Sequence, residues 1–315
     1  MIRELDAVGR TALLAAACRA AESSRADRLF EDPYAERLAG QVGGDLLDEL
    51  DGMTYPAAGE RRMFDTTALL AIRTRLFDDL LQRGAADPGM TQIVLAAAGM
   101  DSRAYRLAWP DHVRCFEIDR PAVLKYKKNC LADVRPRVEL HSVAADLLTD
   151  EWEDDLRAAG YDPELPSMWL LEGLLYYLPE ADTHRLLDRV AAVTSPGSRI
   201  AADICNTTGL TFPDWQPMWT LLAELGAPAL FGHDDPVELL AMHGFSAQAI
   251  MPGDGVTADF ERWEDSVPPS SQNQAPRFFY VIGDRQKTMG RPRAQGQGLN
   301  DNRAVPAPQY TVSST

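Results

Sequence analysis

The stretch from Thr91 to Asp119, TQIVLAAAGMDSRAYRLAWPDHVRCFEID, constrains the fold of this chain more than any other. It begins with an apolar run over residues 93–98, which is typical of a parallel strand buried on both faces. Gly99 then permits a tight turn and a close approach of the backbone to a ligand. A short helical segment and a second strand over residues 113–118 follow. A strand, a glycine turn, a helix and a strand that ends in a carboxylate form the half-fold that binds the adenosine part of a cofactor.

The loop between these two strands indicates the kind of cofactor. Glu117 and Asp119 follow Gly99 by 18 and 20 residues, which suits both a nicotinamide dinucleotide and S-adenosylmethionine. A dinucleotide needs two further glycines for its pyrophosphate. This loop instead has Asp101, which would repel a phosphate and could accept a hydrogen bond from an ammonium group. We therefore expect S-adenosylmethionine; a ligand-free structural crossover and a nicotinamide-dependent dehydrogenase remain the alternatives.

Several separate motifs, found in order, resemble those of one family. The segments LAAAGMDSRAYRL and FEIDRPAVLKYK, with TALLAAACRAAESSRADRLFEDPYAERL before them and WLLEGLLYYLP after them, resemble the bacterial branch of the leucine carboxyl methyltransferase family of S-adenosylmethionine-dependent O-methyltransferases. The resemblance runs from about residue 8 to about residue 205. It implies an α/β fold with a class I methyltransferase-type Rossmann-like sheet, mostly parallel with an antiparallel closing strand. In one departure, Ala97 replaces the first glycine of a Gly-x-Gly loop, so its methyl group narrows the space beside the cofactor.

The domain organisation follows from the length and from two shifts in composition. We expect a single methyltransferase domain over residues 1–284, with a helical N-terminal cap over residues 1–88. Residues 285–315 are polar and rich in Gly, Pro, Gln and Asn, and should form a disordered tail. Residues 206–236 form an insertion whose aromatic side chains either cover a substrate with a large apolar body, as a lid, or build a small satellite core. These aromatic residues are Phe212, Trp215, Trp219 and Phe231.

Charge and residue spacing exclude several classes of function. The net charge of −16 would repel nucleic acid and anionic membranes. No segment approaches the roughly 20 apolar residues that cross a bilayer, and MIRELDAVGR lacks the pattern of an export signal. The four cysteines and five histidines show no spacing typical of a metal site or a disulfide framework. We expect a reduced, cytoplasmic protein with no metal, nucleic acid or membrane partner; the oligomeric state is not indicated.

A helix expected over residues 60–83 carries the most informative single residue. At about 100° per residue, its leucines share one broad face, and Arg73 lies in the middle of that face. A guanidinium is costly to bury without an anion, so Arg73 should meet a carboxylate of the protein or of a ligand. The resemblance implies that Arg73 holds the carboxylate of S-adenosylmethionine. It also implies that Arg19 on the first helix is a second basic contact, with a solvated arginine as the alternative.

Further candidates follow the third and fourth strands. Asp146 and Leu147 come just after a strand over residues 138–143, where the resemblance implies contact with the adenine ring; helix capping is the alternative for Asp146. Glu172 ends the next strand, and ligands of open parallel sheets bind beyond the carboxyl ends of the strands. The resemblance implies that Glu172 lies near the methionine end of the cofactor and that Tyr177 is catalytic, near the transfer site. Capping for Glu172 and simple packing for Tyr177 are the structural alternatives.

Other charged residues are expected to be structural. Lys125, Lys127 and Lys128 should form the solvated face of a helix over residues 121–134, and His184 should be an exposed polar residue. Residues 40–56 should form a surface loop or a short helix.

The resemblance limits the methyl acceptor to a class. Family members esterify either the C-terminal carboxylate of a protein phosphatase subunit or carboxyl groups of small molecules such as aromatic polyketides. A carboxylate is already ionised near pH 7 and needs no general base, and nothing in the chain resembles a strong base placed for a phenol or an alcohol. The aromatic insertion favours a small-molecule carboxylic acid, and with it a role in secondary metabolism. A catalytically silent binding module is the alternative, because Ala97 could spoil the pocket.

Overall fold

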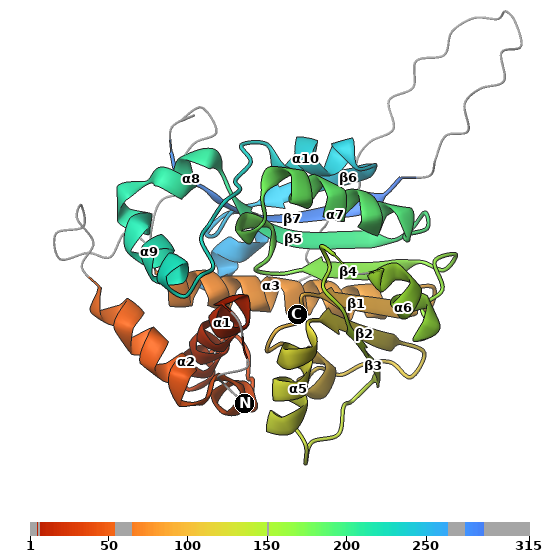
Figure 1. Ribbon diagram of the computed structural model, residues 1–315, viewed down its shortest axis with the longest axis horizontal. Coiled ribbons are helices and arrows are strands. Elements are labelled where there is room, and N and C mark those ends of the chain that lie inside the picture. The colour runs from red at the N-terminus through yellow and green to blue at the C-terminus, as the bar shows by residue number, and fades with distance from the viewer. Residues whose placement is uncertain (1–4, 6, 54–64, 150, 264–274, 287–315) are drawn as a thin grey trace, which may run out of the picture.

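Seven strands form one sheet in the order β3-β2-β1-β4-β5-β7-β6 (Figure 1). The computed structural model describes residues 5, 7–53, 65–149, 151–263 and 275–286. Neighbouring strands among the first five are parallel, whereas β7 runs antiparallel to both β5 and β6. This arrangement confirms the predicted fold class. The strands are β1 (Gln92–Ala96), β2 (Arg114–Asp119), β3 (Glu139–Ala144), β4 (Ser167–Leu171), β5 (Arg199–Cys205), β6 (Phe245–Ile250) and β7 (Phe278–Arg285).

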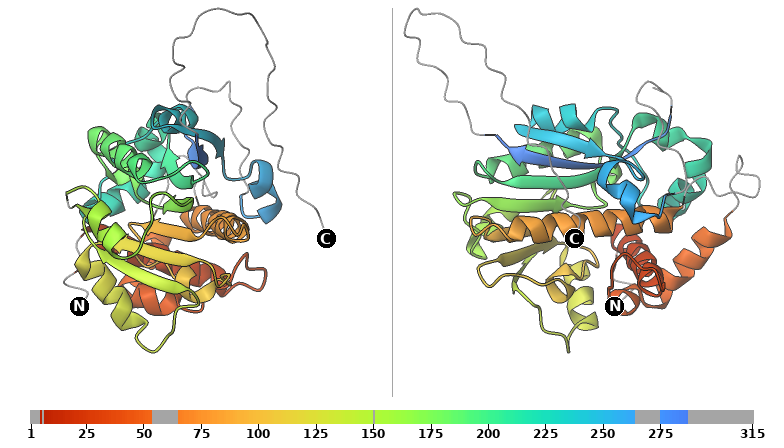
Figure 2. Two further views of the ribbon diagram at one scale, coloured as in Figure 1. Left: turned by 90° about the vertical axis from the view of Figure 1, so that its right-hand side faces the viewer. Right: turned by 180° about the vertical axis from the view of Figure 1, so that it is seen from behind.

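Helices cover both faces of the sheet, and α3 lies along one of them (Figures 1 and 2). Alternate residues of each strand point to opposite faces, so Ile93 and Leu95 belong to one hydrophobic core, and Val94 and Ala96 to the other. This explains why β1 is apolar throughout. The first core includes residues of α1 (Ala7–Ser23), α2 (Ala35–Gly52), α3 (Thr66–Ala85), α4 (Arg103–Arg106), α5 (Pro121–Cys130) and α9 (Gln216–Glu224). The second includes residues of α6 (Trp152–Ala158), α7 (Glu180–Ala192) and α10 (Pro236–Met242).

The order of the strands reverses between β1 and β4. The chain proceeds outward from β1 through β2 to β3, and then returns to place β4 and β5 on the other side of β1. In an open parallel sheet such a reversal opens a crevice at the carboxyl ends of the two central strands. Short helices complete the chain, namely α8 (Thr207–Thr211) and the 3₁₀ helices η2 (Leu175–Tyr177), η3 (Pro213–Trp215) and η4 (Gly255–Phe260). None of the described helices is long and apolar enough to cross a membrane.

The structure sets the bounds of three predicted segments. Of the two alternatives for residues 40–56, the helix is present: α2 continues to Gly52 across a kink at Gly40 (φ 56°, ψ −169°), because Leu46 and Leu50 give it a buried face. The helix predicted from residue 60 begins at Thr66, where the Asp65 side chain caps it, and residues 60–64 lie outside the described residues. Strand β7 extends to Arg285, and residues 287–315 of the predicted tail also lie outside the described residues.

Lys127 does not lie on a solvated face, and this prediction was wrong. Its Nζ lies 2.6 Å from Oε1 of Glu117 on β2, and both side chains are 2% exposed. Burial raises the pKa of Glu117, while the neighbouring ammonium group opposes that rise. The helical pattern could not show that a carboxylate lies directly beneath this turn of α5. Lys125 and Lys128 are exposed, as predicted.

His184 is half-buried rather than exposed, which corrects a second expectation. Its Nδ1 lies 2.9 Å from Nε2 of His243, whose Nδ1 lies 2.7 Å from Oδ1 of Asp188. These contacts join α7 to the end of α10. We therefore assign the histidine pair a structural role.

We expect Lys127→Ala to lower the free energy of unfolding by about 3 kcal/mol near pH 8, because Glu117 would be left charged and unpaired in the core. Without Lys127 the pKa of Glu117 in the folded protein would rise further above its unfolded value. The loss of free energy of unfolding should therefore be small below the pKa of Glu117 in the unfolded chain. It should grow as the pH rises through the pKa of Glu117 in the folded protein. Urea unfolding from pH 5 to pH 8 measures this profile.

The matched control is Lys128→Ala, which removes the exposed neighbour and should change the free energy of unfolding by less than about 0.5 kcal/mol. Equal losses in the two variants would contradict the importance of the buried pair.

Candidate functional site

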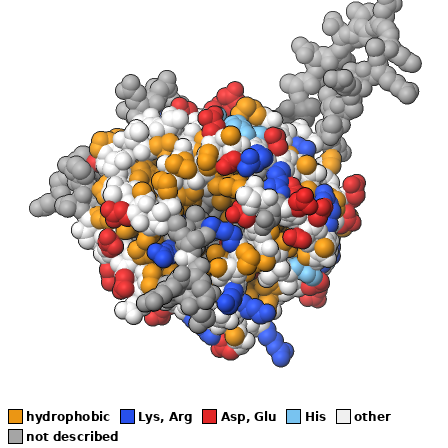
Figure 3. Space-filling view, in the orientation of Figure 1, with side chains coloured by type: hydrophobic (Ala, Val, Ile, Leu, Met, Phe, Trp, Pro, Cys, Tyr) orange, Lys and Arg blue, Asp and Glu red, His pale blue; other side chains and the backbone are white. Residues whose placement is uncertain are grey.

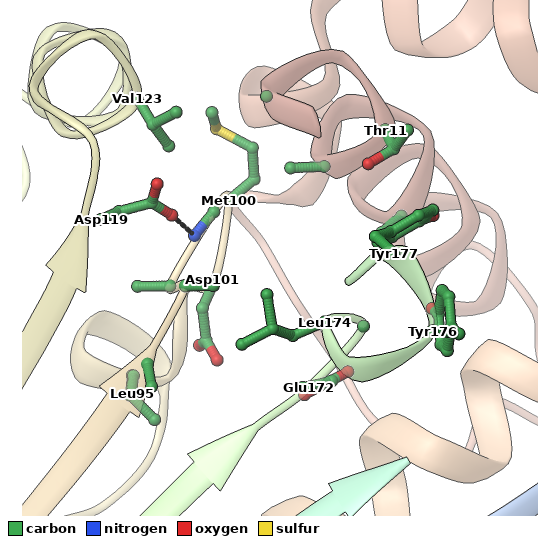
Figure 4. Close-up of a pocket in the computed structure, with 18 of the residues that line it drawn as sticks. Thr11, Leu95, Met100, Asp101, Asp119, Val123, Glu172, Leu174, Tyr176 and Tyr177 are labelled. Atoms are coloured by element: carbon green, nitrogen blue, oxygen red, sulfur yellow. Dashed lines mark hydrogen bonds between the residues drawn. The ribbon is translucent and has the colours of Figure 1, made fainter. Parts of the chain in front are cut away.

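A cavity of about 330 Å³ lies at the carboxyl ends of the central strands (Figure 4). Its size is in the range of about 300–1,000 Å³ that is usual for ligand sites. On the face shown in Figure 3, hydrophobic side chains gather around a hollow. The structure brings all the predicted site residues together in the lining of this cavity: Arg19, Arg73, Gly99, Asp119, Asp146, Leu147, Glu172 and Tyr177. Their roles toward a ligand stay predictions.

The glycine turn after β1 is tied to the end of β2. The Gly99 N–H donates to Oδ2 of Asp119 over 2.6 Å, and the Arg120 N–H donates to Oδ1 over 2.7 Å (Figure 4). Gly99 has a φ of +48°, and a Cβ on it would lie 3.0 Å from the Cβ of Ala12 on α1. The position therefore requires glycine both for its backbone and for the approach of α1. Burial raises the pKa of Asp119, and the two N–H groups oppose that rise.

The two acidic candidates of β2 have different roles. Glu117 is paired with Lys127 in the core, whereas Asp119 lines the cavity from the end of the strand. Asp119 is thus the one of the two acidic residues that lines the cavity, and its contact with ribose hydroxyls stays a prediction.

Arg73 meets carboxylates of the protein, one of the two possibilities left open by the sequence. Its Nη1 donates to Oδ2 of Asp203 over 2.7 Å and to the hydroxyl of Tyr176 over 3.5 Å. Its Nε lies 2.8 Å from Oε1 of Glu172, as an ion pair without the geometry of a hydrogen bond. The side chain is 6% exposed and the residue lines the cavity. Among the described residues, these contacts with Asp203, Tyr176 and Glu172 use Nε and Nη1 of Arg73.

Arg19 is not a solvated arginine. Its Nε lies 2.9 Å from Oδ2 of Asp32, and its Nη2 donates to the backbone oxygen of Met100 over 2.5 Å. The residue thereby holds α1 against the loop that follows β1. Its predicted contact with the cofactor remains compatible with its place in the cavity lining.

Two further charged residues of the site, Arg103 and Asp203, were not predicted from the sequence. Arg103 is 3% exposed, and its Nη1 lies 2.5 Å from Oδ2 of Asp101 and 2.6 Å from Oε2 of Glu172. Helix α4 has four residues, too few for a hydrophobic period to show that Arg103 points inward. Asp203 did carry a signal, because an acidic residue inside the apolar strand RIAADIC is costly to bury without a partner.

The arginines keep two cavity carboxylates ionised. Burial alone would raise the pKa of Asp101, but the charge of Arg103 and further contacts outweigh it and lower that pKa to about 2. Burial likewise opposes the ionisation of Glu172, and Arg103 and Arg73 together lower its pKa. Burial raises the pKa of Tyr177 to about 12, with its side chain hydrogen-bonded to Thr11. At neutral pH Tyr177 is therefore a hydrogen-bond donor rather than a base.

The loop after β3 combines a turn with a place at the cavity. The Leu148 N–H donates to Oδ1 of Asp146 over 2.9 Å, so Asp146 forms a local turn. It does not cap a helix, because the N-cap of α6 is Glu151. The backbone oxygen of Leu147 accepts from Nε1 of Trp152 and from Nη1 of Arg189. Both Asp146 and Leu147 line the cavity, which is compatible with the predicted adenine contact.

The insertion over residues 206–236 contributes to the wall of the cavity and to the two main hydrophobic cores rather than to a separate satellite core, and its role as a lid stays a prediction. Trp219 lines the cavity, and its indole N–H donates to the backbone oxygen of Gly209 over 2.9 Å. Trp215 and Phe231 are buried in the two hydrophobic cores instead. The apolar wall contributed by α9 and by the start of β7 consists of Met218, Trp219, Leu222 and Phe278.

The fold and this cavity define a class I methyltransferase architecture. A protein from Thermobifida fusca YX that is described as a methyltransferase matches with a TM-score of 0.55 and 19% identity, over 81% of this chain and 93% of that chain. A DUF574 family protein from Streptomyces avermitilis MA-4680 matches with a TM-score of 0.53 and 12% identity, over 84% of this chain and 98% of that chain. At these identities the likeness shows the fold alone.

The chain belongs to the leucine carboxyl methyltransferase family, whose model matches residues 12–191. It is 46% identical over 203 residues to a protein of Parafrankia sp. (strain EAN1pec). The matched region covers 62% of this chain and 63% of that protein. The chain is 43% identical over 213 residues to a protein of Mycolicibacterium paratuberculosis (strain ATCC BAA-968 / K-10), over 65% of this chain and 70% of that protein. Both are named S-adenosyl-L-methionine-dependent methyltransferases. The predicted family and the predicted cofactor, S-adenosylmethionine, are thereby confirmed.

Ala97, the departure noted in the loop, has a φ of +55°. A residue with a Cβ loses about 1–2 kcal/mol in this left-handed region, whereas glycine loses about 0.5–1 kcal/mol of chain entropy on folding. We therefore expect Ala97→Gly to raise the free energy of unfolding by about 0.5–1 kcal/mol. Urea unfolding at constant pH measures the change.

Ala98→Gly is the control, because Ala98 is not among the residues with positive φ. It should lower the free energy of unfolding by about 1 kcal/mol. If Ala97→Gly were destabilising to the same degree, the left-handed conformation would not be a source of strain.

Proposed function

We propose that the protein transfers a methyl group from S-adenosylmethionine to a carboxylate oxygen of a small-molecule acid with an apolar, aromatic body, such as a polyketide-type natural product. One observation carries this proposal. A single cavity joins the glycine turn and Asp119 to an aromatic wall that includes Trp219 and Phe278, with Tyr177 and Arg73 in the same lining.

The residues present fit the cofactor, which when bound supplies a methyl group on a positively charged sulfur. Asp119 would accept from the ribose hydroxyls, and Gly99, which also lines the cavity, lets the backbone approach the ligand closely. Asp146 and Leu147 would contact the adenine ring. Arg73, buried and facing the cavity, would bind the carboxylate of the amino-acid end.

The acceptor side of the cavity is suited to an acid that needs no deprotonation. The described lining contains no histidine, lysine or cysteine, and Asp101 and Glu172 are held by arginines. Tyr177 keeps its proton and can donate it as a hydrogen bond to an acceptor carboxylate. The aromatic wall of α9 and the approach of α1 over Gly99 would exclude water around the reacting atoms.

The proposal is tested in two steps. Calorimetry should show binding of S-adenosylmethionine and S-adenosylhomocysteine, whereas affinities weaker than millimolar would favour a silent binding module. Candidate aromatic acids, and a peptide with a free C-terminus for comparison, are then incubated with labelled cofactor and analysed by mass spectrometry. Gain of one methyl group that mild alkali removes marks an ester. A methyl group that resists alkali would indicate an ether or N-methyl product and overturn carboxylate methylation, and labelling of the peptide alone would indicate a protein substrate.

We expect Tyr177→Phe to lower kcat/KM by about 10-fold to 100-fold, because a hydrogen bond to a charged group contributes about 1.5–3 kcal/mol. Methyl transfer measured at several acceptor concentrations gives this ratio. Tyr161→Phe is the control, since the Tyr161 hydroxyl bonds to Ser167 and Val193 within the other core. Tyr161→Phe should leave kcat/KM unchanged. Equal falls in kcat/KM in the two variants would contradict the proposed role of Tyr177 in methyl transfer.

A further inference from the structure

A chain of alternating arginines and carboxylates runs beside the cavity. Nε of Arg103 lies 2.6 Å from Oδ1 of Asp78 on α3, and Nη1 of Arg106 lies 2.6 Å from Oδ2 of the same carboxylate. Nε of Arg106 lies 3.8 Å from Oδ2 of Asp32. The described chain, in order of contact, is Arg19, Asp32, Arg106, Asp78, Arg103, Glu172, Arg73 and Asp203, with Asp101 as a branch at Arg103.

Within this chain Arg103 has a distinct place. Its Nη1 contacts Asp101 and Glu172 at the same time, over 2.5 Å and 2.6 Å, while its Nε is fixed by Asp78. Asp101 comes from the loop after β1 and Glu172 from the end of β4, and Figure 4 shows both at the cavity. A single guanidinium thus joins two carboxylates from the two strands between which the strand order reverses.

We propose that Arg103 is a positioning residue that holds the carboxylates of Asp101 and Glu172 together as a paired anionic site for the ammonium group of the cofactor's amino-acid end. This inference rests on the proposed function of the cavity. The three donors of an ammonium group match two adjacent carboxylates, and Arg73 would hold the ligand carboxylate from the other side of Glu172.

Without Arg103 the two carboxylates would repel each other. Like charges that share a site raise the pKa of one of the groups, because both cannot easily be ionised. Protonation would remove part of the negative charge that attracts an ammonium group. Other charged or titratable groups that act on these two carboxylates would remain. They are Arg19 on α1, Glu117 on β2 and Lys127 on α5 for Asp101, and Arg73 on α3, Asp203 on β5 and Tyr280 on β7 for Glu172.

Arg106 provides a matched control for a merely structural role. Its side chain is 4% exposed, as is that of Arg103, and it binds both oxygens of Asp78. Its further contacts are with Ser102 and Asp32. Loss of Arg106 should therefore disturb the same network while leaving the paired carboxylates held by Arg103.

The experiment measures binding of S-adenosylhomocysteine by calorimetry between pH 6 and pH 8, with wild type, Arg103→Gln and Arg106→Gln. Wild type and R106Q should show Kd values that change by less than about twofold across this range, because their paired carboxylates stay ionised. For R103Q, Kd should rise by about tenfold for each pH unit below the raised pKa of the pair. Thermal unfolding of both variants reports the loss of stability that a structural role alone would produce.

A second ligand identifies the ammonium group as the cause. 5′-Methylthioadenosine lacks the amino-acid end, so its Kd should be independent of pH in every variant. The inference would be overturned if the Kd of S-adenosylhomocysteine depended on pH in the same way in R103Q and R106Q. It would also be overturned if the Kd of 5′-methylthioadenosine for R103Q showed the same pH dependence as that of S-adenosylhomocysteine. Failure of wild type to bind either ligand would instead overturn the proposed function.

Arg103→Lys and Arg106→Lys decide the question if R103Q does not fold. A lysine keeps the charge but has a single ammonium head that cannot bridge both carboxylates and Asp78. R103K should bind S-adenosylhomocysteine about 10-fold to 100-fold more weakly than R106K, the loss expected for one hydrogen bond to a charged group. Equal affinities of these two variants would overturn the inference.

Discussion

The burial of Arg73 against carboxylates is the interaction on which the site depends. A guanidinium stays charged under all ordinary conditions, so a buried arginine needs anions around it. Arg73 has them in Glu172 and Asp203, which follow or belong to two neighbouring strands. The pair of contacts locks α3 to β4 and β5, and Asp203 also accepts the Gly173 N–H over 2.6 Å, which shapes the exit of β4. Charge pairing, rather than apolar packing, thereby sets the geometry at this end of the sheet.

The buried charges around Arg73 are also paired with groups of opposite charge. Arginines and carboxylates alternate from α1 to β5, so that each buried charge has an opposite neighbour. Removing one member of such a set leaves an uncompensated buried charge, which is more costly than never having built the pair. The arrangement also leaves the cavity lined by fixed charges. Fixed charges of this kind need little reorganisation when a charged ligand binds.

The apolar half of the cavity has a different origin. The reversal of strand order opens the crevice, and α1 and α9 then cover it with side chains that also belong to the first hydrophobic core. Trp219 serves both purposes, because it packs on Tyr176 with ring centroids 5.8 Å apart and lines the cavity. The aromatic wall is therefore continuous with the core, whereas the glycine turn on the other side is held by hydrogen bonds such as that from the Gly99 N–H to Asp119.

Much of the fold and of the site could be read from local patterns. The apolar run of β1, the glycine at position 99 and the carboxylate at position 119 predicted a cofactor half-fold, because period and spacing determine which side chains share a face or a sheet edge. The same patterns placed Arg73 on a buried face. Arg103 and Lys127 escaped this reasoning, the first because its helix is too short to have a period and the second because its partner lies on another element.

The sequence by itself determined the fold class, the family, the kind of cofactor and eight of the residues that line the cavity. Only the tertiary structure decided how the charges are paired: Arg73 with Asp203, Arg103 with both Asp101 and Glu172, and Lys127 with Glu117. The physical reason is that hydrophobic periodicity is local along the chain, whereas the energy of a buried charge depends on groups that the fold brings near from distant positions.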